Sequence, residues 1–258
     1  MATASPATGR PRCSARWSND RRAGAVMEPL AHPSPNFGPR RGGARPDMVV
    51  LHYTAMPSTG AALARLCDPA TEVSCHYLVS ESGTVLHLVA EEDRAWHAGA
   101  GAWGEVSDVN SRSIGIELAN PGGAPFPAPQ MTALEALLAG VVARWGIVPE
   151  RVIGHSDVAP GRKSDPGPKF DWRRLACQGL SVWPGARDAA GASFAALARR
   201  AGYVWTAGDV TAEAAVLAAF RQRFRPAARG PLAIEDMERL ADLAARWPVA
   251  LDRNSASP

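Results

Sequence analysis

The sequence is poor in the features that mark several large protein classes. Its longest uninterrupted apolar run, Ala136 to Ala143, is far shorter than the roughly 20 residues that a membrane-spanning helix needs. The 4 cysteines among 258 residues form no CxxC pair, which excludes a cysteine-based zinc ribbon and gives no sign of a disulfide framework. A net charge of +3 gives no argument for nucleic-acid binding. The remaining composition, 46% hydrophobic and 21% charged, is typical of a globular protein.

The positive charge is concentrated at the N-terminus. Residues 1–45 contain eight arginines and only two acidic residues, so this segment carries about +6 and the rest of the chain about −3. The segment has no continuous apolar stretch of the kind that a secretory signal contains. We expect residues 1–30 to be a disordered extension, with Met27 as a possible true start. A transit peptide or a nucleic-acid-binding tail is the alternative interpretation.

Strand and helix patterns alternate over the first two thirds of the chain. A hairpin is indicated where two short runs flank Gly83, which can adopt positive φ in the turn. Ile114, Ile116 and Leu118 share one face of a strand, and Glu117 lies on the other. This alternation predicts an α/β domain with helices packed on a sheet. The expected strands are 48–52, 75–79, 84–89, 113–118 and 152–155, and the expected helices are 61–66 and 129–145.

In the last third of the chain, the apolar residues recur only at the intervals typical of helices. Residues 181–191 are typical of a linker, and three short helices are expected after it. Phe194 marks the first, Phe220 the second and Leu240 the third, and Thr211 is the expected N-cap of the second. Such helices could bury a small common core over residues 192–250.

The polar residues with catalytic potential follow two of the apolar strands. His52 and His155 end their strands, where a single histidine is ordinarily a packed core or rim residue. The loop after His155 is different, because it places Asp157, Lys163 and Asp165 on one proline-stiffened segment. Two neutral imidazoles and one carboxylate make a three-ligand zinc set, which leaves a fourth position for water, as in catalytic sites.

Five sequence blocks together resemble one known family. They are L-H-Y-T, V-S-C-H-Y-L-V, R-A-W-H-A-G, S-I-G-I-E-L and G-H-S-D-V-A-P-G-R-K-S-D-P-G-P. In order and spacing they are similar to the zinc-dependent N-acetylmuramoyl-L-alanine amidases of type 2, which share their fold with peptidoglycan recognition proteins and a bacteriophage lysozyme. The resemblance covers residues 33–183. Residues 192–250, with F-R-P at 224–226, resemble the three-helix peptidoglycan-binding module of larger members.

The resemblance implies a fold and a division of the chain. The expected fold is a central mixed β-sheet flanked by helices, with a small C-terminal three-helix bundle. The expected domains are the extension 1–30, a catalytic domain at 31–180, a linker at 181–191 and a helical peptidoglycan-binding-like domain at 192–250.

The resemblance also assigns site residues. It implies that His52, His155 and Asp165 bind Zn²⁺, that Glu117 is the catalytic carboxylate, and that Lys163 lies beside the reacting carbonyl. A carboxylate on the strand face opposite the isoleucines can take a proton from water and pass it to a leaving amine. A nearby ammonium can stabilise the developing oxyanion. Taken singly, Glu117 would be a surface acid and Lys163 a solvated loop charge.

Other residues of the family motifs have weaker assignments. Trp96, His97 and Asn110 are expected to line the cleft and bind sugar or peptide, with a purely structural role as the alternative. Asp157 is expected to orient the loop or a ligand rather than to bind metal. His76 is expected to be structural.

Two further points concern Cys75 and the nearby Cys67. Some relatives have a catalytic tyrosine before the histidine at position 76, whereas this chain has Cys75, so no such role is assigned. A disulfide between Cys67 and Cys75 is possible but has no support in the sequence.

The expected function is hydrolysis of the amide between N-acetylmuramic acid, or its 1,6-anhydro form, and L-alanine. The substrate would be peptidoglycan or muropeptides, in cell-wall recycling or remodelling. The alternatives are a non-catalytic peptidoglycan sensor and a zinc amidase for another acyl-amino acid. The missing apolar leader favours the cytoplasm, whereas the helical module favours export to the periplasm. The sequence predicts no oligomeric state.

Overall fold

The computed structural model describes residues 28–206 and 208–249. The expected extension 1–30 therefore falls almost wholly outside the described residues, and Leu30 already lies in β1 (Leu30–Ala31). Among the described residues, no helix is both long and apolar enough to cross a membrane.

A mixed six-stranded sheet forms the centre of the molecule, with the strand order β1-β5-β4-β7-β3-β8. Three neighbouring pairs, β4–β7, β7–β3 and β3–β8, are parallel, whereas β4 and β5 are antiparallel. β1 pairs with β5 in parallel, and a separate antiparallel pair joins β2 to β6. The remaining strands are β2 (Phe37–Pro39), β3 (Met48–Tyr53), β4 (Tyr77–Val79), β5 (Val85–His87), β6 (Asp93–Ala95), β7 (Ser113–Leu118) and β8 (Val152–Gly154).

The predicted strands are all present, although most of them begin or end at other residues than expected. The hairpin around Gly83 is formed by β4 and β5, and Gly83 has φ +89°. The strand expected from residue 75 begins only at Tyr77. His155 does not end its strand but begins a helix, because the Asp157 carboxylate accepts a hydrogen bond from the Gly154 N–H at 2.9 Å and so caps a helical turn.

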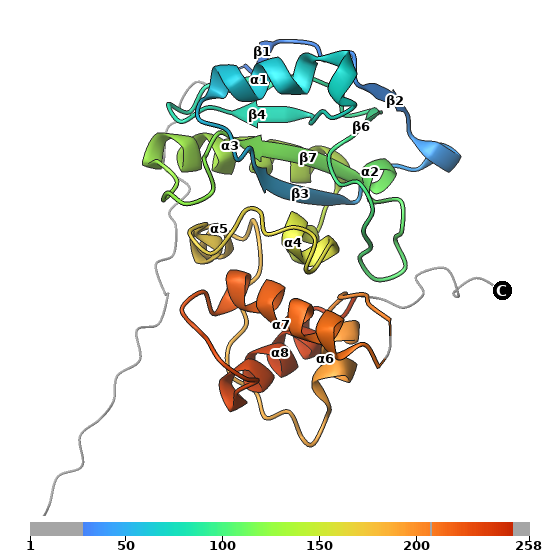
Figure 1. The fold of residues 1–258 in the computed structure, drawn as a ribbon, viewed down its shortest axis with the longest axis vertical. Helices are drawn as coiled ribbons and strands as arrows, with labels where there is room; N and C mark the ends of the chain where they lie inside the picture. Colours follow the sequence, from blue (N-terminus) through green and yellow to red (C-terminus); the bar gives the residue numbers. More distant parts are fainter. Residues whose placement is uncertain (1–27, 207, 250–258) are drawn as a thin grey trace, which may run out of the picture.

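Helices cover both faces of the sheet (Figure 1). The longest, α3, buries Leu134, Leu138 and Val141 at three- and four-residue spacing and ends at Gly146, whose φ is +65°. The helices of this part are α1 (Thr59–Cys67), α2 (Val109–Arg112), α3 (Ala128–Trp145), α4 (His155–Val158) and α5 (Trp172–Cys177), with single 3₁₀ turns at Arg41–Gly43, Pro69–Thr71 and Pro149–Arg151.

The three C-terminal helices are α6 (Phe194–Arg200), α7 (Val210–Phe224) and α8 (Ile234–Arg246). The expected N-cap Thr211 is wrong. Asp209 caps α7 instead, because its carboxylate accepts from the Ala212 N–H at 2.9 Å. Both residues are good caps, and the one that lies first along the chain starts the helix.

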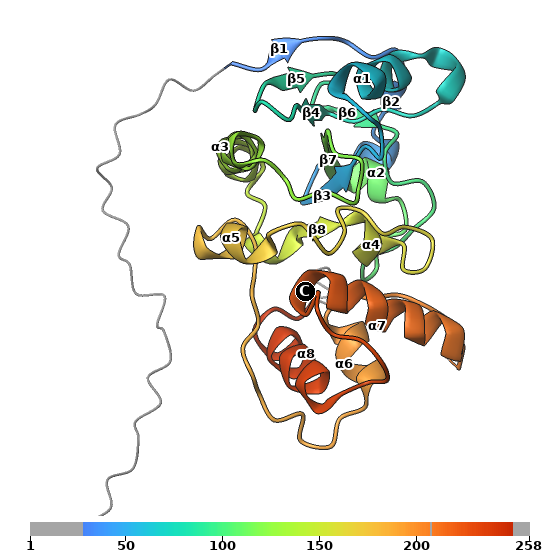
Figure 2. The ribbon, with the colours of Figure 1, turned by 60° about the vertical axis from the view of Figure 1, so that its left-hand side comes forward.

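The C-terminal helices lie directly against the end of the sheet that carries β8 and α4 (Figure 2), and α7 packs next to α4. One apolar cluster joins both parts of the chain. It includes Met48, Val50, Ile153 and Val158 from the sheet region and Phe194, Tyr203, Phe220, Phe224 and Leu240 from the C-terminal region. The C-terminal helices therefore complete the core on one side of the sheet. The division of the chain at 181–191 stays a prediction.

Candidate active site

The predicted functional residues meet at the carboxyl ends of three parallel strands. His52 lies near the end of β3 and pairs in register with Glu117 of β7. His155 follows β8 directly, and Asp165 lies on the loop after α4. Parallel strands end at the same edge of a sheet, and α/β proteins place their binding sites there.

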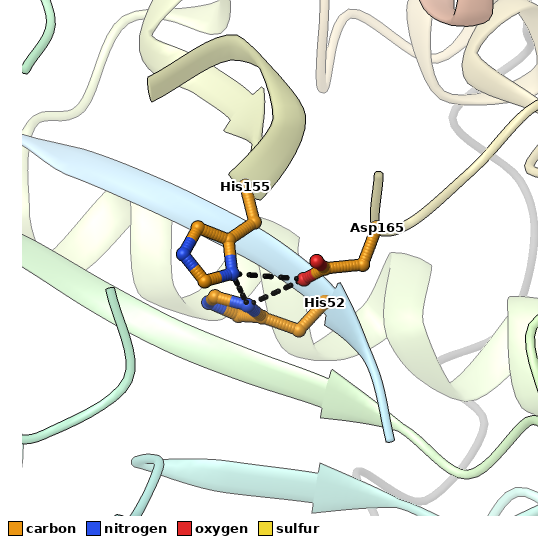
Figure 3. A group of neighbouring side chains, drawn as sticks. All are labelled: His52, His155 and Asp165. Carbon is orange, nitrogen blue, oxygen red and sulfur yellow. Dashed lines mark hydrogen bonds and ion pairs between the residues drawn. The ribbon is translucent and has the colours of Figure 1, made fainter. Parts of the chain in front are cut away.

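Three potential ligand atoms converge at this edge (Figure 3). Nδ1 of His52 lies 3.0 Å from Nδ1 of His155 and 2.8 Å from Oδ2 of Asp165, and the latter two atoms are 3.0 Å apart. All three side chains are buried. This is a group that could hold a metal ion.

The outer nitrogen of His155 fixes the tautomer of its ring. Nε2 lies 2.8 Å from the Ala98 carbonyl oxygen, which can only accept a hydrogen bond. Nε2 therefore carries the proton, and in the neutral ring Nδ1 presents its lone pair to the other two ligand atoms. Such an outer contact is typical of metal-binding histidines.

A chain of hydrogen bonds fixes the His52 ring in the same way. The Ser113 hydroxyl donates to the Val109 carbonyl at 2.6 Å, so Ser113 Oγ must accept from Nε2 of His97, 3.1 Å away. Nδ1 of His97 then accepts from Nε2 of His52 at 3.0 Å. We infer that Nδ1 of His52 is also unprotonated.

The protonation states of this group suit a cation. Burial, and then the neighbouring His155, lower the pKa of His52 to about 4, so this ring is neutral at pH 7. Burial alone would raise the pKa of Asp165, but contacts with the two imidazoles lower it below its usual value. With Nδ1 of each ring unprotonated, the two rings and the carboxylate point lone pairs at one another across about 3 Å. A divalent cation between them would remove this repulsion, so the donor set fits a metal ion.

Glu117 lines the same cavity. Its Oε2 atom is buried and makes no hydrogen bond within the described part of the chain. Burial first, and then the negative charge of Asp165, raise its pKa to about 8, while Lys163 opposes this shift. A buried carboxylate oxygen without a hydrogen bond destabilises a fold, so the presence of Oε2 in a cavity indicates a functional role.

The cavity has a volume of about 340 Å³. It brings together the three ligand candidates, Glu117, Lys163, Trp96 and His97. Arg65 and Met56 on its wall were not predicted, because nothing in their local sequence links them to the motifs. Arg162 was also missed, although it stands next to Lys163, and its guanidinium donates to the Ala98 carbonyl at 2.7 Å.

Asn110 is placed differently from the other two predicted substrate-binding residues. Its side chain is buried and is not among the residues that line the cavity. Its Oδ1 accepts hydrogen bonds from the backbone N–H groups of His97, at 3.1 Å, and Ala98, at 2.8 Å. These contacts favour the alternative considered from the sequence, in which Asn110 shapes the chain around His97.

Three further predictions concern His76, the pair Cys67 and Cys75, and Asp157. His76 is buried, and its Nδ1 accepts from the Gly115 N–H at 2.9 Å, a structural contact in agreement with the prediction. Cys67 and Cys75 are free, so the possible disulfide between them is not formed. Asp157 lies outside the metal-capable group and caps α4.

The sequence is similar to known proteins over its catalytic half. A family model described as N-acetylmuramoyl-L-alanine amidase matches residues 42–168. The chain is 42% identical over 156 residues to the N-acetylmuramoyl-L-alanine amidase AmiD of Escherichia coli, a match that covers 54% of this chain and 55% of AmiD. It is 31% identical over 160 residues to the 1,6-anhydro-N-acetylmuramyl-L-alanine amidase AmpD of Enterobacter cloacae, covering 55% of this chain and 86% of AmpD.

Solved structures extend the likeness into the C-terminal helices. E. coli AmiD, in complex with the substrate anhydro-N-acetylmuramic acid-L-Ala-D-gamma-Glu-L-Lys, superposes with a TM-score of 0.71 at 34% identity and covers 82% of this chain and 98% of that one. AmpDh3 of Pseudomonas aeruginosa gives a TM-score of 0.73 at 34% identity, over 80% of this chain and 93% of that one. The expected mixed sheet flanked by helices, with helices at the C-terminus, is confirmed. By its sequence, its fold and the residues gathered at its sheet edge, the chain belongs to the N-acetylmuramoyl-L-alanine amidase family.

Proposed function

We propose that this protein is a zinc amidase that cleaves the bond between N-acetylmuramic acid, or its 1,6-anhydro form, and L-alanine in muropeptides or peptidoglycan. The observation that supports it most is the convergence of His52, His155 and Asp165 beside Glu117, whose buried Oε2 atom makes no hydrogen bond within the described residues. The related AmiD and AmpDh3 structures were solved with anhydromuramyl peptides bound, which supports the same substrate class here.

The proposed ligands are Nδ1 of His52, Nδ1 of His155 and Oδ2 of Asp165. When bound, zinc would supply Lewis acidity at this position. The hydrogen bonds from Nε2 of His155 to Ala98 and from Nε2 of His52 to His97 hold both rings in the ligating tautomer.

Glu117 is the proposed proton carrier. As a carboxylate it accepts a proton from the attacking water, and as a carboxylic acid it returns this proton to the departing nitrogen of L-alanine. A raised pKa suits a group that must both accept and donate near neutral pH. Lys163 favours the ionised state of Glu117, and its ammonium is proposed to stabilise the oxyanion that forms from the substrate carbonyl.

Trp96 lines the cavity and is proposed to contact substrate. His97 also lines it, but its hydrogen bond to His52 favours a role in orienting that ligand. A cytoplasmic location for the reaction stays a prediction.

The decisive assay is mass spectrometry of a muramyl-peptide digest with purified protein, with chelator, and with zinc restored. We expect free peptides that begin with L-alanine, lost with the chelator and recovered with zinc. Parallel digests of anhydro and ordinary muramyl peptides would give the sugar preference. If zinc binds but neither substrate is cleaved, the proposal of a muramyl-L-alanine amidase fails, and a peptidoglycan sensor or an amidase for another acyl-amino acid takes its place.

A further inference from the structure

A buried arginine of the C-terminal helices reaches α4, the helical turn that begins at His155. Arg223 of α7 donates from Nη1 to Oδ2 of Asp157 at 3.0 Å. The exposed fractions of these two side chains are 3% and 1%, so the ion pair is shielded from water. An ion pair so deeply buried depends strongly on both partners, because loss of one leaves the other charge uncompensated.

A second C-terminal residue binds the other oxygen of the same carboxylate. The hydroxyl of Tyr203, which is buried, donates to Oδ1 of Asp157 at 2.8 Å. The Tyr203 ring packs edge-on against Trp103, which holds the hydroxyl in place. Both oxygens of Asp157 are therefore bound by side chains from beyond the catalytic region.

Asp157 connects Arg223 and Tyr203 to the backbone at His155. Its Oδ2 also accepts from the Gly154 N–H at 2.9 Å, which caps α4 at the point where His155 begins it. Nη2 of Arg223 donates to the Val152 carbonyl at 2.8 Å, at the start of β8. One guanidinium thus holds the chain on both sides of His155.

We infer that Arg223 and Tyr203 are positioning residues for the metal ligand His155, and that they act through Asp157. The C-terminal helices then have a second role besides any contact with glycan: they hold the geometry of the metal site. This inference rests on the metal site proposed above.

The same helix offers a matched control. Arg221 is also buried in α7 and also binds a carboxylate, since its Nε lies 3.1 Å from Oδ1 of Asp236. Asp236 belongs to α8, and within the described part of the chain none of the hydrogen bonds of Arg221 reaches the metal-capable group. Loss of Arg221 therefore measures general destabilisation of the C-terminal helices.

The test measures zinc affinity by chelator competition on folded, metal-free protein, with Arg223→Met, Tyr203→Phe and Arg221→Met beside the wild type. We expect Arg223→Met to weaken zinc binding by about 10- to 100-fold, the range found when groups that orient metal ligands are lost. Tyr203→Phe, which keeps the ring, should weaken it less. Arg221→Met should lower the thermal unfolding midpoint and leave zinc affinity unchanged. Cobalt spectra of the same variants report the ligand geometry independently of turnover.

The outcomes separate this inference from the proposed function. If the wild type bound no zinc, the metal site itself would be wrong. If it bound zinc and both Arg223→Met and Tyr203→Phe bound it equally well, the positioning role alone would be overturned. Equal loss of affinity in Arg221→Met would also overturn it, because the effect would then be general. Should Arg223→Met fail to fold, Tyr203→Phe decides.

Discussion

The imidazole of His97 fills the space that a side chain at Gly115 would need. A Cβ built on Gly115 would lie 2.5 Å from Cδ2 of the ring, well inside contact distance. Ser113, Gly115 and Glu117 share one face of β7. On this face Ser113 hydrogen-bonds to the His97 ring, Gly115 leaves room for that ring, and Glu117 is the proposed proton carrier.

Gly115→Ala tests this arrangement. The added methyl group should displace His97 and so remove the partner that holds the His52 tautomer, and zinc affinity should fall by about 10- to 100-fold. Gly38→Ala is the control, because Gly38 also lies in a strand and its Cβ would meet no atom of the described residues within 4 Å. Unchanged zinc affinity in folded Gly115→Ala would mean that His97 does not orient His52.

Glu117→Gln separates proton transfer from metal binding. The amide has nearly the same shape but cannot carry the proton, so kcat should fall by about 10²- to 10⁴-fold while zinc content stays at the wild-type level. His155→Ala and Asp165→Ala should lose zinc and activity together. Zinc is measured by elemental analysis and kcat by release of peptide. Turnover of Glu117→Gln at the wild-type rate would exclude Glu117 as the base.

Lys163→Met tests the proposed oxyanion contact. Removal of one such donor costs about 10²- to 10³-fold in kcat, and zinc content should not change. Lys169→Met serves as the comparison, since Lys169 is an exposed lysine of the same loop region that does not line the cavity. If both variants lost activity to the same small extent, Lys163 would act only through the overall charge of the loop.

The lowered pKa of Asp236 predicts that the stability of the fold depends on pH. Burial alone would raise its pKa, but hydrogen bonds from Arg221, the Ala233 backbone and Arg225 lower it below the unfolded value of about 4. The stabilisation is therefore complete above about pH 4 and is lost as the pH falls toward the folded pKa.

Urea unfolding of the wild type and Asp236→Asn at about pH 6 and pH 3 would measure this. The difference in unfolding free energy between the two proteins should shrink at the lower pH. A difference that stays the same at both pH values would contradict the assignment.

Local sequence patterns were sufficient to predict the strands of the sheet and part of the candidate site. The apolar runs placed His52 and Glu117 on strands, and parallel pairing of those strands brought the two residues into register. Residue type alone did not distinguish Asp165 from Asp157 as the ligand, and the family resemblance did. The structure gives the physical reason, because the Asp157 oxygens are already bound by Gly154, Tyr203 and Arg223.

Contacts between distant segments could not be predicted in this way. Periodicity marked α7 as amphipathic, but it gave no sign that Arg223 would be buried against Asp157, 66 residues earlier in the chain. Asn110 was assigned to the cleft from its motif, whereas its position depends on how the loop at His97 folds over α2. Such pairings depend on tertiary packing, which neither helical nor strand spacing encodes.

The apolar cluster that joins the sheet to the C-terminal helices has a consequence for biosynthesis. Met48 and Val50 leave the ribosome long before Phe220 and Phe224, yet all four belong to one core. At about 5–20 residues per second, the nascent chain would expose one side of its sheet for several seconds. If Arg223 positions His155 as inferred above, the metal-capable group would reach its final geometry only after α7 has been translated.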